Sequence, residues 1–374
     1  MQFTAVILMA LLTLKLLLLP GKVVVNPMVN KARKLMACGI FLLGIQFLLQ
    51  YTLHLRAMGV TQAVMLNLFL FIPVSWMISM AVLNLQGKGR IKKTDRWIGG
   101  IIWLVTTALI VITAALDGEL FSDTSELRTA EITGSVLYAT MQCHYAWRQT
   151  TNLHSMQRAL QNYYDRDMEG MLRWMQLSII ILMVLALMAP LLIFGSGPWL
   201  AIYAIFFITS IFYLVDTFCN YVLSSAPEKM EEAEDSEEEE LNEKYSCTGT
   251  EISEEKMQRI ERFVEQWTKN GSYLKCGLKL PIAAAEIGVP QYQLSGWLKQ
   301  KNLKYSEWIT TLRIEEAKRV LLEYPEWTLE AVAEHCGFNS REYFHRIFRS
   351  YLGMPPIKYQ QNNGVISELF LRRP

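Results

Sequence analysis

Paired cysteines and the residue patterns of enzymes are missing from this sequence. Its six cysteines form no Cys-x-x-Cys pair, and none lies near histidines at the spacing of metal ligands. We therefore expect six reduced, structural cysteines, no metal site and no cofactor. The sequence also lacks a phosphate-binding loop and a recognisable nucleophile–base pair, so we do not expect an enzyme.

Charged residues are scarce within long apolar blocks in the first 224 residues. Hydrophobic residues make up 52% of the chain, which is high for an ordinary soluble protein. Several blocks approach the ~20 residues that cross a bilayer as a helix. They lie at 2–19, 35–53, 63–83, 97–116, 132–147, 174–195 and 199–223. We predict an all-α protein whose residues 1–224 form a polytopic membrane bundle of about seven spans.

Lys and Arg in the loops predict how this bundle is oriented. They gather in every second loop, and such loops face the cytoplasm. Counted from the N-terminus, loop one carries Lys22, Lys31, Arg33 and Lys34, loop three carries Lys88, Arg90, Lys92, Lys93 and Arg96, and loop five carries Arg148, Arg158, Arg166 and Arg173. We therefore expect the N-terminus outside and the C-terminus in the cytoplasm, as for a multi-pass protein of a bacterial inner membrane.

An acidic stretch separates the apolar blocks from the rest of the chain. Residues 228–243 contain almost no apolar side chains, too few to support a folded core. We expect residues 225–252 to be a disordered linker. One interpretation is a solvated spacer that holds the following domain away from anionic lipid. The other is that its carboxylates compete with DNA phosphates for the basic face of that domain.

Residues 328–356 have the pattern of a helix-turn-helix motif. Three apolar residues near the start share one face of a short helix, and Gly337 follows as a turn residue. We expect Asn339 to cap a second helix, with Glu342 completing a capping box. This second helix has an apolar side formed by Tyr343, Phe344, Ile347 and Phe348. Polar and basic residues remain for its outer side, as in a helix that enters a major groove.

The detailed sequence of this motif goes further. The run Ala-Val-Ala-x-x-Cys-Gly-Phe-x-Ser-x-x-Tyr-Phe-x-Arg-x-Phe, followed by Gly-Met-Pro-Pro, resembles the C-terminal signature of the AraC/XylS family of bacterial transcription regulators. The resemblance covers residues 253–360 and leaves 361–374 as a tail. It implies two helix-turn-helix units joined by one long helix, and a domain that binds double-stranded DNA.

The residues before the motif fit this architecture. Gly288-Val289-Pro290 reads as a turn, after which residues 291–299 form a first recognition helix with Leu294, Trp297 and Leu298 buried. A linker helix near 305–324 follows, with Glu315 and Arg319 spaced for an ion pair. Its expected buried side is Tyr305, Trp308, Ile309, Leu312, Ala317, Val320 and Leu321.

The family resemblance also suggests which side chains read DNA. The first recognition helix would present Tyr292, Gln293, Ser295, Gly296 and Lys299, and the second Arg341, Glu342, His345 and Arg346. Arg346 is our first choice for direct readout, because arginine can donate two hydrogen bonds to guanine. Lys299 and Arg349 look more like phosphate contacts. For each residue the alternative is an ordinary solvated surface position.

The first motif departs from the family pattern. Gly296 stands where many relatives carry a long polar or basic residue, and Asn302 replaces a glycine in the turn that follows. Gln360 replaces a common terminal arginine. We therefore expect the second motif to carry most of the specificity. Asn tolerates the left-handed conformation better than most other residues, so Asn302 can still make the turn.

Polar residues inside the apolar blocks are candidates for signal sensing, because they are costly in a membrane. His144, Asp216 and Asn220 are the strongest, and the last two lie one helical turn apart. The alternative is hydrogen bonding between helices.

Three functions fit these observations. The first is a membrane-embedded transcription regulator whose bundle senses a small-molecule or protein signal. The second is a membrane receptor or transporter whose helical tail binds proteins. The third is a regulator whose bundle is only an anchor. Candidate partners are DNA, the lipid bilayer, RNA polymerase and a second copy of the chain.

Overall fold

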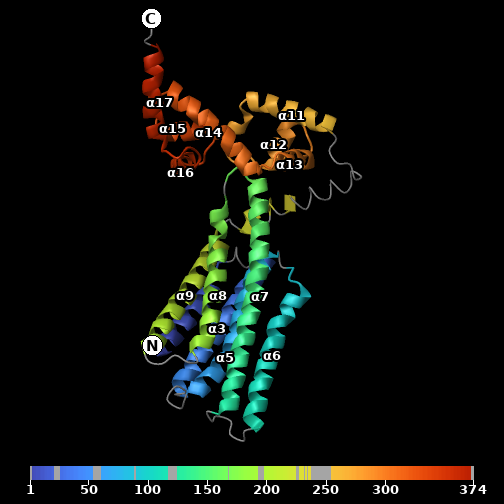
Figure 1. The fold of residues 1–374 in the computed structure, drawn as a ribbon, viewed down its shortest axis with the longest axis vertical. Coiled ribbons are helices and arrows are strands. Elements are labelled where there is room, and N and C mark those ends of the chain that lie inside the picture. Colours follow the sequence, from blue (N-terminus) through green and yellow to red (C-terminus); the bar gives the residue numbers. More distant parts are fainter. Residues whose placement is uncertain are drawn as a thin grey trace. The chain divides into compact units, whose positions relative to one another are not determined.

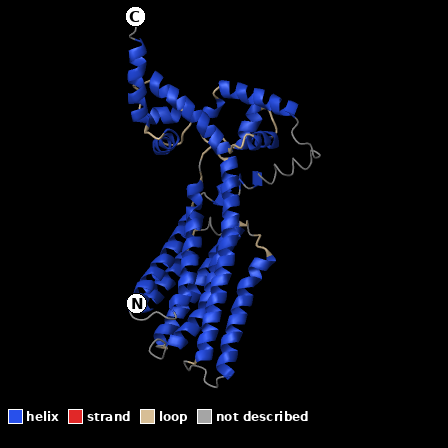
Figure 2. Ribbon diagram, in the orientation of Figure 1, coloured by secondary structure: helices blue, strands red, loops and turns tan. Residues whose placement is uncertain are grey.

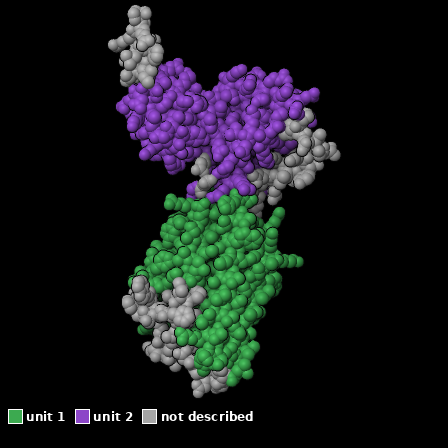
Figure 3. Space-filling model, in the orientation of Figure 1, with its two compact units in different colours: residues 1–156, 171–231 green, residues 157–170, 232–374 purple. Residues whose placement is uncertain are grey.

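The computed structural model describes residues 2–20, 26–53, 60–87, 90–116, 124–166, 168–192, 198–224, 227–230, 232–233, 235–236 and 254–371. Helices account for the regular structure of this described part, apart from one isolated bridge between Tyr164 and Lys279 (Figure 2). The chain divides into two compact units (Figure 3). Unit 1 is Met1–Met156 with Met171–Glu231, and unit 2 is Gln157–Gly170 with Glu232–Pro374.

Unit 1 is a bundle of long helices (Figure 1). They are α1 (Gln2–Leu17), α3 (Pro27–Thr52), α5 (Val60–Gln86), α6 (Lys93–Leu116), α7 (Ser125–Tyr163), α8 (Arg173–Leu192) and α9 (Pro198–Leu223). Residues 157–163 of α7 and the first two residues of the short η1 (Glu169–Leu172) belong to unit 2. Asn26 begins α3 by accepting hydrogen bonds from the N–H groups of Met28 and Val29, and Pro27 suits the first helical position. α3 packs against both α1 and α5, the helices that come before and after it in the chain.

The prediction of seven spans is wrong for the described helices. Five are long and apolar enough to cross a bilayer: α3, most of α5, α6, Gly170–Met188 at the end of η1 and in α8, and most of α9. The predicted span at 2–19 is α1, whose 16 residues reach only about 24 Å against a hydrocarbon core of ~30 Å. The one at 132–147 lies within α7, a 39-residue helix with many polar side chains.

Unit 1 has polar contacts inside and apolar side chains outside. Gln46 and Gln50 both donate to Asn67 Oδ1, over 2.7 and 2.6 Å. Ser75 and Tyr138 form a buried hydroxyl pair at 2.7 Å. Large apolar residues are instead exposed along α6, among them Ile101, Leu104, Ile112 and Leu116. So many large apolar side chains exposed along one helix are unusual for a water-soluble protein.

Most of the acidic linker prediction lies outside the described residues. Between 225 and 252 the structure describes only 227–230, 232–233 and 235–236. Glu232 pairs there with Lys279, and Ser236 accepts a hydrogen bond from Gln291 at 2.8 Å. The described residues of the linker are therefore helical, and Glu232 and Ser236 make contacts within unit 2. Cys247 lies outside the described part, and the five described cysteines are unpaired.

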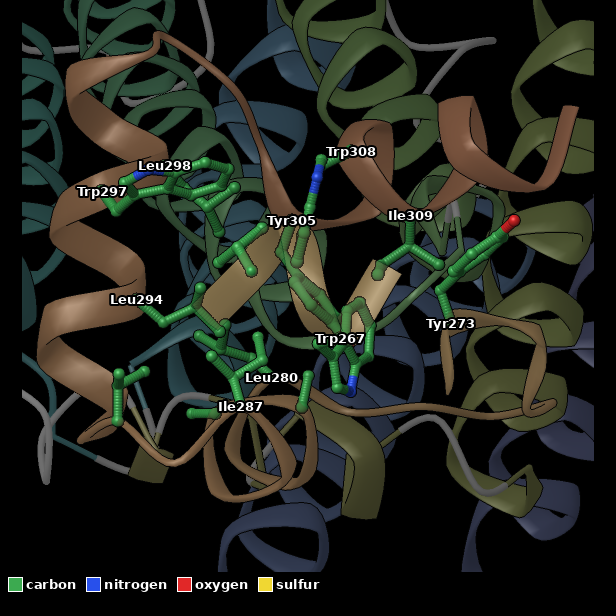
Figure 4. Close-up of a cluster of buried hydrophobic side chains, with 14 of the residues drawn as sticks. Trp267, Tyr273, Leu280, Ile287, Leu294, Trp297, Leu298, Tyr305, Trp308 and Ile309 are labelled. Carbon is green, nitrogen blue, oxygen red and sulfur yellow. The ribbon is translucent and has the colours of Figure 1, made fainter. Parts of the chain in front are cut away.

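The C-terminal part of unit 2 is made of α11 (Glu254–Lys269), η2 (Ser272–Leu274), α12 (Leu280–Ile287), α13 (Gln291–Gln300), α14 (Tyr305–Glu323), α15 (Leu329–His335), α16 (Arg341–Leu352) and α17 (Pro356–Leu371). Two separate apolar cores form within it. The first joins α11, α12, α13 and the N-terminal half of α14, and ten of its side chains are labelled in Figure 4. The second joins the C-terminal half of α14 with α15, α16 and Tyr359.

Candidate nucleic-acid interface

The first helix-turn-helix unit is α12, the turn at Gly288 and α13. Gly288 ends α12 in the left-handed conformation, with φ 82°, and its N–H donates to Ala284. Glycine adopts this conformation without strain. Leu294, Trp297 and Leu298 are buried, as predicted, and face the first core (Figure 4). This packing fixes α13 on its support helix.

The second unit is α15, the turn at Gly337 and α16. Thr328 caps α15 by accepting from the N–H of Ala331 at 3.2 Å. The predicted cap at Asn339 is wrong, because Ser340 caps α16 through the N–H of Tyr343. Asn339 instead accepts a hydrogen bond from Cys276 Sγ at 2.7 Å. The second helix-turn-helix motif therefore contacts the segment just before the first one through this side-chain pair.

The linker helix α14 belongs to both units. Tyr305, Trp308 and Ile309 contribute to the first core, and Ile314, Ala317 and Val320 to the second. The buried side predicted from the sequence is confirmed, although Leu312 is only partly buried. Sequence reasoning missed Arg313, which lies between the two halves and is 2% exposed. A charged residue within an otherwise apolar stripe was the available signal.

Ion pairs on the exposed side of α14 differ from the prediction. Glu315 pairs with Lys318 at 2.6 Å instead of with Arg319. Arg319 binds both oxygens of Glu316, at 2.6 and 3.0 Å, and also pairs with Glu323. The hydrogen bonds from Arg319 lower the pKa of the Glu316 carboxyl against its partial burial. These charges pair with one another on the exposed side of α14.

The outer face of α16 is basic and open. Arg341, Arg346 and Arg349 are exposed, with Glu342 exposed beside them and His345 half-buried. Within the described part of the chain, no carboxylate forms an ion pair with these three arginines. The Arg346 guanidinium lies 5.4 Å from the ring centroid of Tyr343. Phe344 and Phe348 are fully buried beneath, so the helix is held by one side and presents the other.

The predicted residues of α13 are less well placed for DNA. Ser295 is only 6% exposed, so it is less accessible than the sequence analysis predicts. It lies next to Leu294, which is part of the first core. Tyr292 and Gln293 are half-buried and bonded to each other at 3.1 Å, and Lys299 is exposed. The structure thus brings together the second set of predicted residues better than the first.

Three predicted sensing residues lie in unit 1. Asp216 accepts a hydrogen bond from Asn220 at 3.3 Å and pairs with Lys15 at 2.6 Å. His144 lies 3.2 Å from Asp95, which also pairs with Arg148 at 3.1 Å. Asp95 is buried and was missed by sequence reasoning, because it follows a basic loop and precedes an apolar block. In the described residues, no cluster of His, Cys, Asp and Glu could hold a metal ion.

Comparisons with known proteins agree with this geometry. The model of a helix-turn-helix domain matches residues 283–362. The regulator GadX of Escherichia coli K12 is 30% identical over 81 residues, 22% of this chain and 29% of GadX. The uncharacterised regulator YobQ of Bacillus subtilis is 42% identical over 79 residues, 21% of this chain and 32% of YobQ. AdiY of E. coli K12 is 37% identical over 62 residues, 17% of this chain and 24% of AdiY.

These similarities are confined to one part of each protein. The chain spans about a third or less of the length of these relatives. No solved structure matches the chain. The C-terminal part of this chain is thus a helix-turn-helix domain that is similar in sequence to those of these transcriptional regulators.

Proposed function

We propose that this chain is a membrane-embedded transcription regulator that binds specific DNA sequences through its C-terminal domain. The observation that carries the proposal is the outer face of α16. Arg341, Arg346 and Arg349 are exposed there and lack a carboxylate partner in the described residues, while the opposite face is packed into the second core. A rigid helix with an open basic face suits a major groove.

The residues of α16 divide into two roles. Arg346 and Glu342 read base edges, since arginine can bind guanine and glutamate can accept from cytosine. Arg349 lies a turn further along and binds phosphate, which contributes affinity without sequence preference. On α13, Lys299 is the corresponding phosphate contact. With two units on one linker helix, the domain reads two successive major grooves.

The polarity of unit 1 supports a bilayer as its surroundings. Exposed Ile, Leu and Val along α6 cost free energy in water but not in lipid. Buried Gln46 and Gln50 donate interhelical hydrogen bonds to half-buried Asn67, and such bonds hold membrane helices together. We assign unit 1 to the inner membrane, with the helix-turn-helix domain in the cytoplasm, and the polar clusters at His144 and Asp216 to signal reception.

Genome-wide DNA occupancy of the tagged full-length protein tests this function. Three forms are compared: the wild type, Arg346→Ala and Arg259→Ala. Arg259 is a matched control, because it is also exposed and its guanidinium also lies 5.4 Å from a ring, that of Phe263 on α11. We expect sharp peaks for the wild type and Arg259→Ala, and their loss in Arg346→Ala.

Other outcomes would redirect the proposal. Peaks that survive in Arg346→Ala would show that α16 does not read sequence. An absence of peaks in all three forms, with the protein folded and in the membrane, would favour a receptor whose tail binds proteins.

A further inference from the structure

A buried ion pair joins two distant parts of unit 2. Asp165 follows directly on α7, and its Oδ2 accepts a hydrogen bond from Arg313 Nη2 at 2.8 Å. The same oxygen accepts from the backbone N–H of Leu278 at 2.9 Å. The two side chains are 1% and 2% exposed. Such a pair overcomes its desolvation cost only with good geometry and further hydrogen bonds, and both are present here.

Arg313 lies at the joint between the two helix-turn-helix units. Its Nε donates to the carbonyl of Tyr273 at 3.0 Å, and Nη2 donates to that of Lys275 at 2.6 Å. A β-carbon added at Gly337 would lie 3.0 Å from Nε. The guanidinium therefore contacts the chain before α12 in the first unit and the turn of the second. A residue that fixes the position of Arg313 therefore also fixes the relative orientation of the two helix-turn-helix motifs.

Neighbouring residues extend the contact with Asp165. Tyr164 forms an antiparallel bridge with Lys279, and its hydroxyl donates to Glu232 at 3.0 Å. The Lys279 ammonium pairs with Glu232 and lies 5.8 and 6.0 Å from the ring centroids of Tyr163 and Tyr164. The hydrogen bond from Lys279 lowers the pKa of the Glu232 carboxyl. Residues 163–166 are thus held by backbone, aromatic and ionic contacts together.

The chain connects this segment to the bundle without a break. α7 is a single helix, of which residues 125–156 belong to unit 1 and 157–163 to unit 2. Asp165 therefore lies two residues after the end of a helix that begins in unit 1.

We propose that residues 163–166 are an internal docking partner of the DNA-binding domain, and that Asp165, seated on Arg313, fixes the two recognition helices for simultaneous binding. This rests on the proposed function. Each unit has its own core, so undocking leaves each one folded and changes only their relative orientation. A fixed orientation of the two recognition helices raises the affinity of the domain for a DNA site that spans two grooves, but not for a site that occupies one groove.

Docking is tested first, without DNA. Tyr164→Cys and Lys279→Cys are introduced together in a Cys276→Ser background of the full chain. Opposed residues of an antiparallel bridge have Cα atoms ~4.5–5.5 Å apart, within the ~4.4–6.8 Å of disulfides. A protease site inserted between 237 and 250 separates the halves unless they are cross-linked. We expect a disulfide between the cysteines at 164 and 279. The control pair, Tyr164→Cys with Lys358→Cys on α17, should form none. Equal yields for both pairs would overturn the docking.

The effect on DNA binding is tested next. Asp165→Asn keeps the shape of the side chain and removes its charge. We expect about 5-fold or more weaker binding to a site of two successive grooves, the lower end of common coupling strengths, and unchanged binding to a single half-site. Glu261→Gln, which breaks an exposed pair with Lys301, should leave both affinities unchanged. Closing the disulfide in Asp165→Asn should restore the two-groove affinity.

The outcomes separate the two proposals. If the disulfide forms but Asp165→Asn binds both sites like the wild type, docking does not orient the recognition helices. If Asp165→Asn weakens both sites equally, the variant damages folding and the orientation claim fails. If the wild type binds neither site while the disulfide forms, the proposed function fails and the docking remains.

Discussion

A β-carbon at Gly337 would lie 2.3 Å from the carbonyl oxygen of Leu274, a separation that real side chains do not show. Gly337 also has φ 76°, where other residues are strained. The turn of the second helix-turn-helix motif thus fits directly against η2, which precedes the first motif, and only glycine allows this approach.

Gly337→Ala should therefore be severely destabilising and should abolish DNA binding. Backbone strain alone costs about 1–3 kcal/mol, and the clash with a carbonyl adds to it. Thermal unfolding of the full chain in detergent measures the loss. Gly353→Ala is the control, since Gly353 has φ 70° but nothing within 4 Å of the added carbon. Equal losses for the two variants would show that the contact with Leu274 is unimportant.

The cap of α16 gives a second prediction. Ser340→Ala removes the side chain that accepts from the N–H of Tyr343, and should cost about 1 kcal/mol of the free energy of unfolding. Asn339→Ala removes only a bond from a cysteine, a weak donor. Chemical unfolding should rank Ser340→Ala as the more destabilising. The opposite ranking would restore Asn339 as the cap.

Base and phosphate contacts should differ in their dependence on DNA sequence. Arg346→Ala should cost about 1–3 kcal/mol on a specific site and relax the preference at one base pair. Arg349→Ala should weaken binding to all sequences and reduce the slope of log affinity against log salt by about 1. Binding titrations at several salt concentrations measure both. A uniform loss in Arg346→Ala would reassign it to the phosphates.

The pair between Glu316 and Arg319 predicts a pH dependence. Since the folded state lowers the pKa of Glu316, the stabilisation is fully present above the unfolded pKa, ~4.3, and is lost as the pH falls through the lower folded value. The stability difference between wild type and Glu316→Gln should therefore be present above pH ~4.3 and shrink as the pH falls below that value. High salt should reduce it, because Arg319 is largely exposed. A difference that grew at low pH would contradict this assignment.

Local sequence patterns predicted much of the C-terminal domain. Gly288, Asn302 and Gly337 all occupy the left-handed conformation, as their turn positions suggested. The apolar period placed Trp297 and Phe344 in their cores. These features depend on neighbouring residues, so one segment of sequence contains the information.

Long-range contacts could not be predicted in this way. Nothing near Arg313 indicates that its partner is Asp165, because the pair depends on how the chain folds over 148 positions. Family analogy predicts an exposed Ser295, yet the folded domain buries it. Gln360, a departure from the family, bonds the carbonyls of Leu321 and Pro325 at the end of α14. These bonds depend on the packing of α17 against α14, which the sequence around Gln360 does not contain.

The most direct test of the central claim is flotation of the full-length protein with lipid vesicles and DNA. The DNA is a duplex selected from a random pool by the protein itself, and the control is Arg346→Ala. We expect the wild type to carry this duplex to the vesicle fraction, while Arg346→Ala floats without it. Protein that stays at the bottom of the gradient, or wild-type protein that floats without DNA, would contradict a membrane-embedded DNA-binding regulator.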